Sequence, residues 1–322
     1  MKYRNPYQEI NWNNIHRIQG TTHMHCPNAQ YLQNIYDQGI RHMSVSNYYP
    51  SAPIYPLSSR EDFAEVIRED MISCPNAEHH SMMLDGEETT FDPLHVTAPG
   101  STWCSGRPLK ELPKGVNASW RYGFRQLLEH LQFEDGGGIV INHPTWSKLP
   151  VELMTTLLDY DRERVLGIEI YNDSCEQLDN PPDGWDLENW DAILMTGRRC
   201  WGFAVPDHHS SPGYHCLFRG RNVLLVEETA EHACLKAYRD GAFYCQLQNG
   251  ELAFKKIAIT DQNSLVIETD HAARIDVIAD GALRASAEGN SLIFDLSNVK
   301  TYCRIEAHSE EDAIFSNPIM VL

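Results

Sequence analysis

The chain has 322 residues, of which 42% are hydrophobic and 22% are charged, as is usual for globular proteins. Its 26 basic and 45 acidic residues give a formal net charge of −19, which repels phosphate backbones and argues against extensive binding of nucleic acid. The apolar runs are all shorter than the ~18 residues of a membrane span, so we expect no membrane partner.

Cysteine usage and the amino-terminal residues both favour a cytoplasmic protein. Nine cysteines are scattered without any C-x-x-C pair, which is typical of free thiols in a reducing compartment. The opening residues, MKYRNPYQEINWNN, lack the apolar stretch of a signal peptide. A homo-oligomer is compatible with the sequence, which does not specify an oligomeric state.

Up to about residue 245, short apolar runs alternate with segments of helical periodicity. Gly39 and Gly241 are expected to end helices, and Ser59 is expected to begin one as its N-cap. Strands are predicted at 16–25, 41–49, 71–78, 138–144, 165–172 and 200–209. Helices are predicted at 29–40, 58–72, 119–135, 150–160, 187–198 and 229–241. Repeated strand–helix units of this kind predict a parallel sheet or barrel with helices outside.

Beyond about residue 248 the pattern changes to short alternating runs bounded by turn residues, such as SLVIETD, ARIDVIADG and TYCRIEAHS. Period-two alternation favours antiparallel strands, so we predict a small all-β sandwich. The expected domains are therefore 1–248 and 249–322. Covering the mouth of the first domain is the expected role of the second; sugar binding and dimerisation are the alternatives.

Histidines and carboxylates recur at the ends of the predicted strands. His23 and His25 differ by two positions, so a strand directs both rings to one face. Asp207 and His209 repeat that spacing near the end of a later strand. Functional residues of barrels and open parallel sheets gather at the C-terminal ends of strands, so one mouth is expected to collect the whole set. The remaining candidates are Glu78, His95 and His143.

Imidazole and carboxylate together suit zinc, manganese or iron. Structural zinc sites favour cysteine, which this set lacks, so an open catalytic centre is indicated. Glu78 has two carboxylate oxygens and can bridge two ions. The segment DGEETT offers Glu87 and Glu88 as alternatives, but it is typical of a turn, whereas MISCPNAE is typical of a strand and its end.

This ligand pattern resembles the PHP (polymerase and histidinol phosphatase) family. The family motifs correspond here to HMH, NAEH, PLHV, INHP and PDHH. The segments GFAVPDHH, CLKAYRDGAFY and YCRIEAHSEEDAIFSNPI resemble the family branch that carries a C-terminal β domain. The resemblance covers nearly the whole chain. It implies an α/β fold in which a distorted (β/α)7 PHP-type barrel, with metals at the strand C-termini, precedes the β-sandwich.

The resemblance also implies how the ions are held. Tyr31 and Tyr48 stand where the family often has histidines, which would help His209 to hold a third ion, and Asn47 stands where the family usually has an aspartate. We therefore expect two divalent ions of zinc, manganese or iron. The first would be held by His23, His25, Glu78 and Asp207, and the second by Glu78, His95 and His143.

The implied function is hydrolysis of a small phosphorylated substrate, namely a phosphate ester of a metabolite, nucleotide or sugar, by a metal-bound hydroxide. Bound cations would neutralise the phosphate that the acidic chain repels. Catalytic roles are expected for His209, as the acid for the leaving alkoxide, and for Asp207, as a metal ligand. The candidates to hold the phosphate are Arg41, Arg198 and Arg199.

Two other functions remain open at this point. A metal-dependent amidohydrolase or lactonase would use the same kind of centre, but it usually needs a lysine that follows a strand. Lys110, Lys114 and Lys148 lie in loop-like sequence instead. A binding or regulatory protein with a degenerate PHP metal centre is the second alternative, because the expected third-site histidines are missing.

Overall fold

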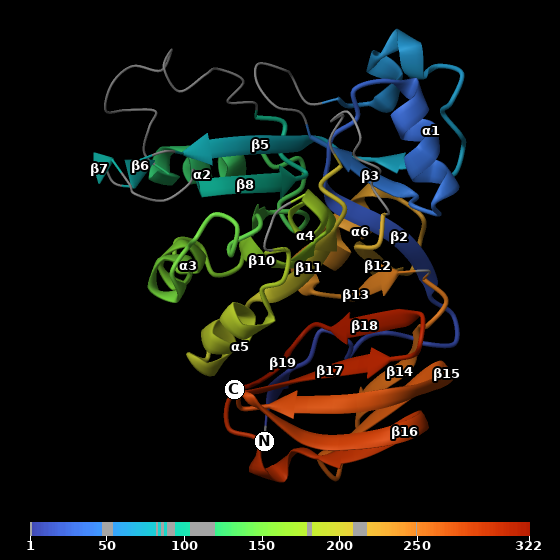
Figure 1. Cartoon of the computed structure of the whole chain (residues 1–322), viewed down its shortest axis with the longest axis vertical. Helices are drawn as coiled ribbons and strands as arrows, with labels where there is room; N and C mark the ends of the chain where they lie inside the picture. Colours follow the sequence, from blue (N-terminus) through green and yellow to red (C-terminus); the bar gives the residue numbers. More distant parts are fainter. Residues whose placement is uncertain are drawn as a thin grey trace.

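The computed structural model describes residues 2–46, 54–81, 83–84, 87–88, 94–103, 120–178, 182–208, 218–248 and 250–322. The fold is mixed α/β, with a large curled sheet, a second open sheet and helices packed against them (Figure 1). Figure 1 shows the C-terminal strands gathered at one end of the molecule beside both chain termini, and α1 (Ala29–Asp37) at the other end.

The large sheet joins the two ends of the chain. Its pairings are antiparallel except at β2–β3–β4, which is parallel. A branch of β14 (Phe254–Ile259), β15 (Ser264–Ala279) and β16 (Ala282–Asp295) joins it through β17. The main path runs β1 (Tyr3–Arg4), β19 (Ile319–Val321), β17 (Tyr302–His308), β18 (Asp312–Ser316), β13 (Phe243–Gln248), β12 (Arg221–Val226), β2 (His16–Met24), β3 (His42–Val45) and β4 (Ile72–Ser73).

The second sheet contains five strands, which are most of the strands outside the large sheet. The three strands on one side of this sheet are parallel to one another, and the two strands on the other side are each paired antiparallel to the strand before them in the sheet order. A separate hairpin pairs β6 (Met83–Leu84) with β7 (Glu87–Glu88). The five strands are ordered β11 (Trp201–Val205), β10 (Val165–Asn172), β9 (Ile139–Ile141), β8 (Leu94–Pro99) and β5 (Asn76–Ser81). Within the described ranges the two sheets are not hydrogen-bonded into one ring, so closure into a (β/α)7 barrel stays a prediction.

The helices mostly follow the predicted segments. Asn28 caps α1 by accepting a hydrogen bond from the Tyr31 amide. Gly241 ends α6 with a φ of 76°, a left-handed conformation that glycine adopts without strain. No helix in the described ranges is long and apolar enough to cross a membrane. The other helices are α2 (Trp120–Glu129), α3 (Val151–Leu158), α4 (Asp173–Leu178), α5 (Leu187–Met195) and α6 (Glu231–Asp240).

The helix predicted over residues 58–72 is wrong. That segment forms two 3₁₀ turns, at Leu57–Ser59 and Glu61–Phe63, and it ends in the short strand β4. Leu57 and Phe63 are buried in the core beneath α1, while the Arg60 guanidinium donates to Asp62 at 2.7 Å. Tertiary burial of two apolar side chains thus overrides the local helical periodicity.

Residues 250–322 are joined to the rest of the chain by strand pairing and by buried polar contacts. Strand β13 pairs with β18, so hydrogen bonding continues across the expected boundary near residue 248, which itself stays a prediction. The buried Arg304 guanidinium of β17 donates two hydrogen bonds of 2.7 Å to the Asp191 carboxylate on α5. The Tyr302 hydroxyl donates to the same carboxylate at 2.6 Å. These contacts fix the C-terminal strands against the helix that precedes β11.

A neutral histidine is enclosed between β2 and α6. His42 on β3 is fully buried, and its ring lies 5.5 Å from that of Tyr238. A glycine is required at position 20 on the neighbouring strand, because a Cβ there would lie 2.9 Å from both the His42 Cβ and the Tyr238 hydroxyl. Within the described part of the chain neither ring nitrogen of His42 has a hydrogen-bond partner. Burial lowers the pKa of His42 to about 3.

We expect His42 to make the protein less stable in mild acid. Because its folded pKa lies below the ordinary value of 6.5, its contribution is complete above pH 6.5 and is lost as the pH falls toward 3. Between pH 7.5 and 5.0 the loss is roughly 2 kcal/mol. Over this pH interval, urea unfolding should show that the free energy of unfolding falls by roughly 2 kcal/mol less in His42→Leu than in the wild type. Exposed His271→Leu serves as the control, and equal losses in the wild type and His42→Leu would refute the assignment.

Candidate metal centre

The histidine pair at the end of β2 faces three carboxylates. His23 is fully buried, with Nδ1 2.8 Å from Oε1 of Glu169 and Nε2 3.0 Å from Oδ1 of Asp207. His25 lies with Nε2 3.4 Å from the same Asp207 oxygen and Nδ1 3.8 Å from Oε2 of Glu78. The two rings are 5.3 Å apart, edge to face. The expected convergence of this pair on Asp207 is therefore present.

Glu78 links the first pair to two further histidines. Its Oε1 lies 2.8 Å from Nε2 of His95, and Nδ1 of His95 lies 2.8 Å from Nε2 of His143. Both Glu78 oxygens thus face imidazoles, one on each side. Glu78 lies inside β5 rather than at a strand end, because β5 extends beyond it to Ser81 and pairs antiparallel with β8.

Two of these side chains sit on strained backbone. His143 has a φ of 28° and Asp207 a φ of 45°, values that residues other than glycine rarely adopt. The Asp207 amide donates to the His23 carbonyl at 3.2 Å, and the His25 amide donates to the His208 carbonyl at 3.2 Å. Backbone hydrogen bonds therefore connect the segment after β11 to the end of β2. Such strain gathers at functional sites, where the surroundings hold it in place.

Sequence reasoning missed a buried carboxylate at the centre of this arrangement. Glu169 of β10 is fully buried, and its Oε2 accepts hydrogen bonds from the His143 amide at 2.8 Å and from Asn172 Nδ2 at 2.9 Å. Asn172 Nδ2 also donates to Oδ2 of Asp207 at 3.1 Å. The available signal was a single carboxylate within the otherwise apolar run VLGIEIYN, since a charge inside a buried strand needs partners.

The loop after β9 is held by a second buried carboxylate. Asp186 accepts hydrogen bonds from the Thr145 hydroxyl at 2.7 Å and the Thr145 amide at 3.1 Å. Burial raises the pKa of Asp186 to about 6, although these bonds and one from Asn189 oppose the shift. Thr145 lies two residues after His143, so Asp186 fixes the loop that carries that ring.

The charge state of His23 follows from its carboxylate neighbours. Burial alone would lower the pKa of His23, but Asp207 and Glu169 together outweigh it and raise the pKa to about 9. A proton on the buried imidazole therefore balances the carboxylates in the protein without cations. Metal binding requires the neutral ring, so a cation would take over this role and displace the proton.

The donor set fits divalent cations. Two groups of buried side chains place one ligand atom each within 4.8 Å of one another, namely His23–His25–Glu78 and His23–His143–Asp207. Two donors held about 2.1 Å from one ion lie roughly 3.0–3.4 Å apart, as the contacts of Asp207 with His23 and His25 do. The Glu169 contact fixes the His23 ring so that Nε2 points at this centre, as carboxylates beyond the ligands do in metal sites.

The grouping differs in detail from the expected division of ligands. His143 belongs with His23 and Asp207, whereas His95 lies between Glu78 and His143 and joins neither three-residue group. His209, Asn47 and Tyr48 lie outside the described residues, as do the side chains of Glu87 and Glu88. Tyr31 is described, and its ring lies 4.6 Å from that of His208. The assignment of each ligand to an ion stays a prediction.

The arginines named as phosphate-binding candidates lie elsewhere. Arg198 and Arg199 precede β11, whereas Asp207 follows its other end. Arg198 pairs with Asp159, and the buried Arg199 guanidinium donates to backbone carbonyls, including that of Leu166 at 3.2 Å. Arg41 precedes β3 and pairs with Asp70. These three arginines therefore lie at the strand ends that are remote from the metal centre. Their ion pairs and hydrogen bonds stabilise the fold.

The fold and the centre define an α/β protein with a buried histidine–carboxylate cluster suited to divalent cations. No family model matches the chain, and no curated protein matches it significantly. Among solved structures, it resembles a two-domain protein containing a predicted PHP-like metal-dependent phosphoesterase from Bacteroides vulgatus ATCC 8482, with a TM-score of 0.51. That match has 12% sequence identity and covers 97% of this chain and 96% of the other, so the likeness concerns the fold.

Proposed function

We propose that the protein is a metal-dependent phosphoesterase with a PHP-type barrel, which hydrolyses a phosphate ester of a small metabolite, nucleotide or sugar. The observation that carries the proposal is the meeting of buried imidazoles with Glu78 and Asp207 from five separate strands or strand ends. A bound pair of divalent cations would supply water activation and charge neutralisation for the phosphoryl group. The similar fold of a protein that contains a predicted PHP-like metal-dependent phosphoesterase supports the same proposal.

In such a site, the residues of this chain would have three roles: they would bind the cations, orient the ligands and donate a proton. His23, His25, His95, His143, Glu78 and Asp207 supply the donor atoms for the cations. Glu169 and Asn172 keep the imidazoles and Asp207 oriented by hydrogen bonds. His209, two residues after Asp207, is proposed to donate the proton to the leaving alkoxide. The acidic chain needs the cations because the described centre contributes carboxylates and imidazoles but no arginine or lysine.

A chromogenic aryl phosphate tests the proposal against its alternatives. We expect 4-nitrophenyl phosphate to be hydrolysed with added Mn²⁺ or Zn²⁺ and to be spared with excess chelator. A parallel assay with an aryl ester, an anilide and a lactone tests the amidohydrolase or lactonase alternative. Hydrolysis of those carbonyl substrates alone would overturn the phosphoesterase proposal. Cation binding without turnover of any substrate would favour the regulatory alternative.

A further inference from the structure

The loop after β9 places a hydroxyl group next to the ring of His143. Ser147 is fully buried, and its Oγ lies 3.1 Å from Nδ1 of His143. The turn between the two residues fixes this contact, because the Ser147 amide donates to the His143 carbonyl at 3.0 Å. The Leu149 amide donates to the Pro144 carbonyl at 3.0 Å and holds the same turn. Nδ1 of His143 therefore has a hydroxyl as its partner.

The other nitrogen of the His143 ring faces the metal centre. Nε2 of His143 lies 2.8 Å from Nδ1 of His95, and Nε2 of His95 lies 2.8 Å from Oε1 of Glu78. The centre of the His143 ring is also 5.9 Å from that of His23, which contacts Asp207. A cation among these side chains would therefore be bound through Nε2 of His143, and not through the Nδ1 atom beside the hydroxyl.

With both rings neutral, the hydrogen bonds in this row of side chains have one consistent direction in the metal-free protein. The Glu78 carboxylate only accepts, so Nε2 of His95 donates to it. Nδ1 of His95 then carries a lone pair and accepts from Nε2 of His143. Nδ1 of His143 is left with its lone pair, which accepts from the Ser147 hydroxyl. Each of the three contacts then joins a donor to an acceptor.

A cation needs the opposite arrangement at His143. An imidazole binds a cation through a nitrogen without hydrogen, so Nε2 must lose its hydrogen to water. The neutral ring then takes a hydrogen from water at Nδ1, and its charge is unchanged. Ser147 suits both forms, because a hydroxyl can donate or accept after rotation about its Cβ–Oγ bond. The Nδ1 partner of His23 is instead the Glu169 carboxylate, which accepts only.

We propose that Ser147 is a positioning residue that allows His143 to change tautomer when a cation binds. In the metal-free protein the Ser147 hydroxyl donates to Nδ1 of His143, and in the cation-bound protein it accepts from the same atom. The inference rests on the cation binding of the proposed function, and it concerns which ring nitrogen carries hydrogen. It adds a residue that touches neither the cation nor the substrate and acts through His143 alone.

Nitrogen-15 NMR of the histidine side chains in the full chain tests this proposal, because a ring nitrogen that carries hydrogen differs in chemical shift from one that does not. The signals of His143 are identified as those missing from His143→Gln. We expect hydrogen on Nε2 in the metal-free protein and on Nδ1 in the protein loaded with Zn²⁺. The same tautomer in both states, while Zn²⁺ binds, would overturn this proposal and leave the metal centre intact. Failure to bind any Zn²⁺ would overturn both.

Calorimetric titration of the metal-free protein with Zn²⁺ provides a second measurement. Ser147→Ala leaves the Nδ1 hydrogen of the cation-bound form without its acceptor, so the affinity for Zn²⁺ should fall about tenfold. Ser147→Thr keeps a hydroxyl and should bind Zn²⁺ within about threefold of the wild type. Thermal unfolding of each variant checks that the fold is retained, and the NMR comparison of the wild type does not depend on that check.

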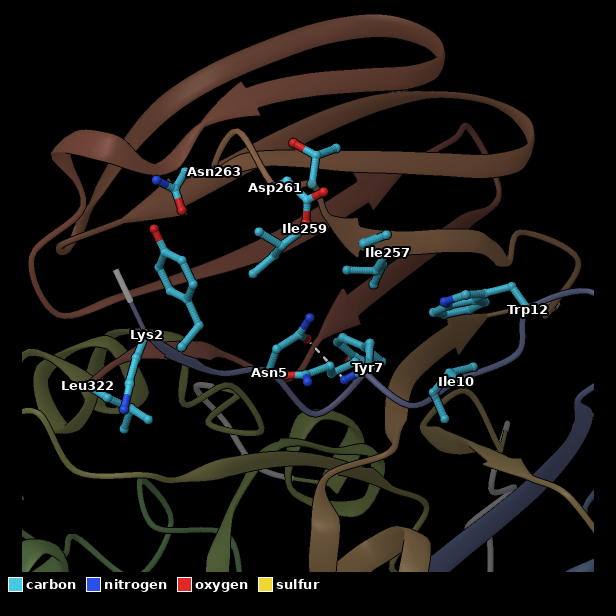
Figure 2. A pocket seen from close by; sticks show the side chains of 14 residues that line it. Lys2, Asn5, Tyr7, Ile10, Trp12, Ile257, Ile259, Asp261, Asn263 and Leu322 are labelled. Atoms are coloured by element: carbon cyan, nitrogen blue, oxygen red, sulfur yellow. Dashed lines mark hydrogen bonds between the residues drawn. The ribbon is translucent and has the colours of Figure 1, made fainter.

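Two controls remove a hydroxyl at a distance from the metal centre. Ser101 is as buried as Ser147, but it follows the end of β8 that is remote from His95, and its hydroxyl donates to the Leu127 carbonyl at 2.8 Å. Thr260 lines an open cavity of about 590 Å³ between residues 2–12 and 257–263 (Figure 2). Ser101→Ala and Thr260→Ala should both bind Zn²⁺ as the wild type does. Wild-type affinity in Ser147→Ala as well would contradict the proposed role of its hydroxyl.

Discussion

Replacing His23 with alanine is expected to lower kcat/KM for 4-nitrophenyl phosphate by more than about 100-fold. Loss of a residue that only orients a ligand costs 10–100-fold, and loss of the ligand itself should cost more. His23 belongs to both three-residue groups of the centre, so its removal affects each of them. It also leaves the buried Asp207 and Glu169 without the imidazole between them.

A control on the same strand separates the loss of a ligand from disturbance of β2. His16 begins β2 and is exposed, so His16→Ala should keep wild-type activity. Metal-dependent kinetics of the three proteins should be compared at saturating Mn²⁺, with circular dichroism as the check on folding. If His23→Ala retains activity within twofold of the wild type, His23 is not a ligand of the catalytic ions.

Replacing Glu169 with glutamine is expected to weaken Mn²⁺ or Zn²⁺ binding by about 10–100-fold, because the carboxylate orients ligands rather than holding the ion itself. In the wild type it contacts the His23 ring at 2.8 Å and the His143 amide at 2.8 Å. The amide side chain is nearly the same size but lacks the charge that favours the orientation of His23. Titration calorimetry of the metal-free protein measures this affinity directly.

Glu163→Gln is the matched control for Glu169→Gln. Glu163 pairs with Arg4 at the surface, so the same chemical change there should leave metal affinity at the wild-type value. Unchanged affinity in Glu169→Gln would show that the contacts of Glu169 serve folding alone. An equal loss in both variants would point instead to a general effect of charge.

Local spacing predicts much of the centre. The period of two in a strand places His23 and His25 on one face, and the polar residues after the apolar run of β11 indicate Asp207. Glu169 could not be identified as part of the centre from the sequence, because its partners come from β2 and the loop after β9. Its significance lies in contacts between segments that are more than 25 residues apart.

For the fold too, local sequence patterns predict individual strands and helices but not the contacts between distant segments. Strands β10 and β11 and the helix ended by Gly241 follow from apolar runs and a terminal glycine, although β11 ends at Val205, short of the predicted end at 209. The pairing of β13 with β18 joins segments that the sequence assigns to different domains, and no local pattern specifies it. The predicted helix at 58–72 fails because burial of Leu57 and Phe63 outweighs helical periodicity.

The central claim is that the imidazoles and carboxylates around His23 bind divalent cations. Anomalous diffraction from crystals grown with Mn²⁺ tests it most directly. The account predicts anomalous peaks within about 2.0–2.3 Å of His23 Nε2 and of an Asp207 oxygen, with Glu78 also among the ligands. Manganese bound elsewhere on the chain, with no peak near these atoms, would contradict it.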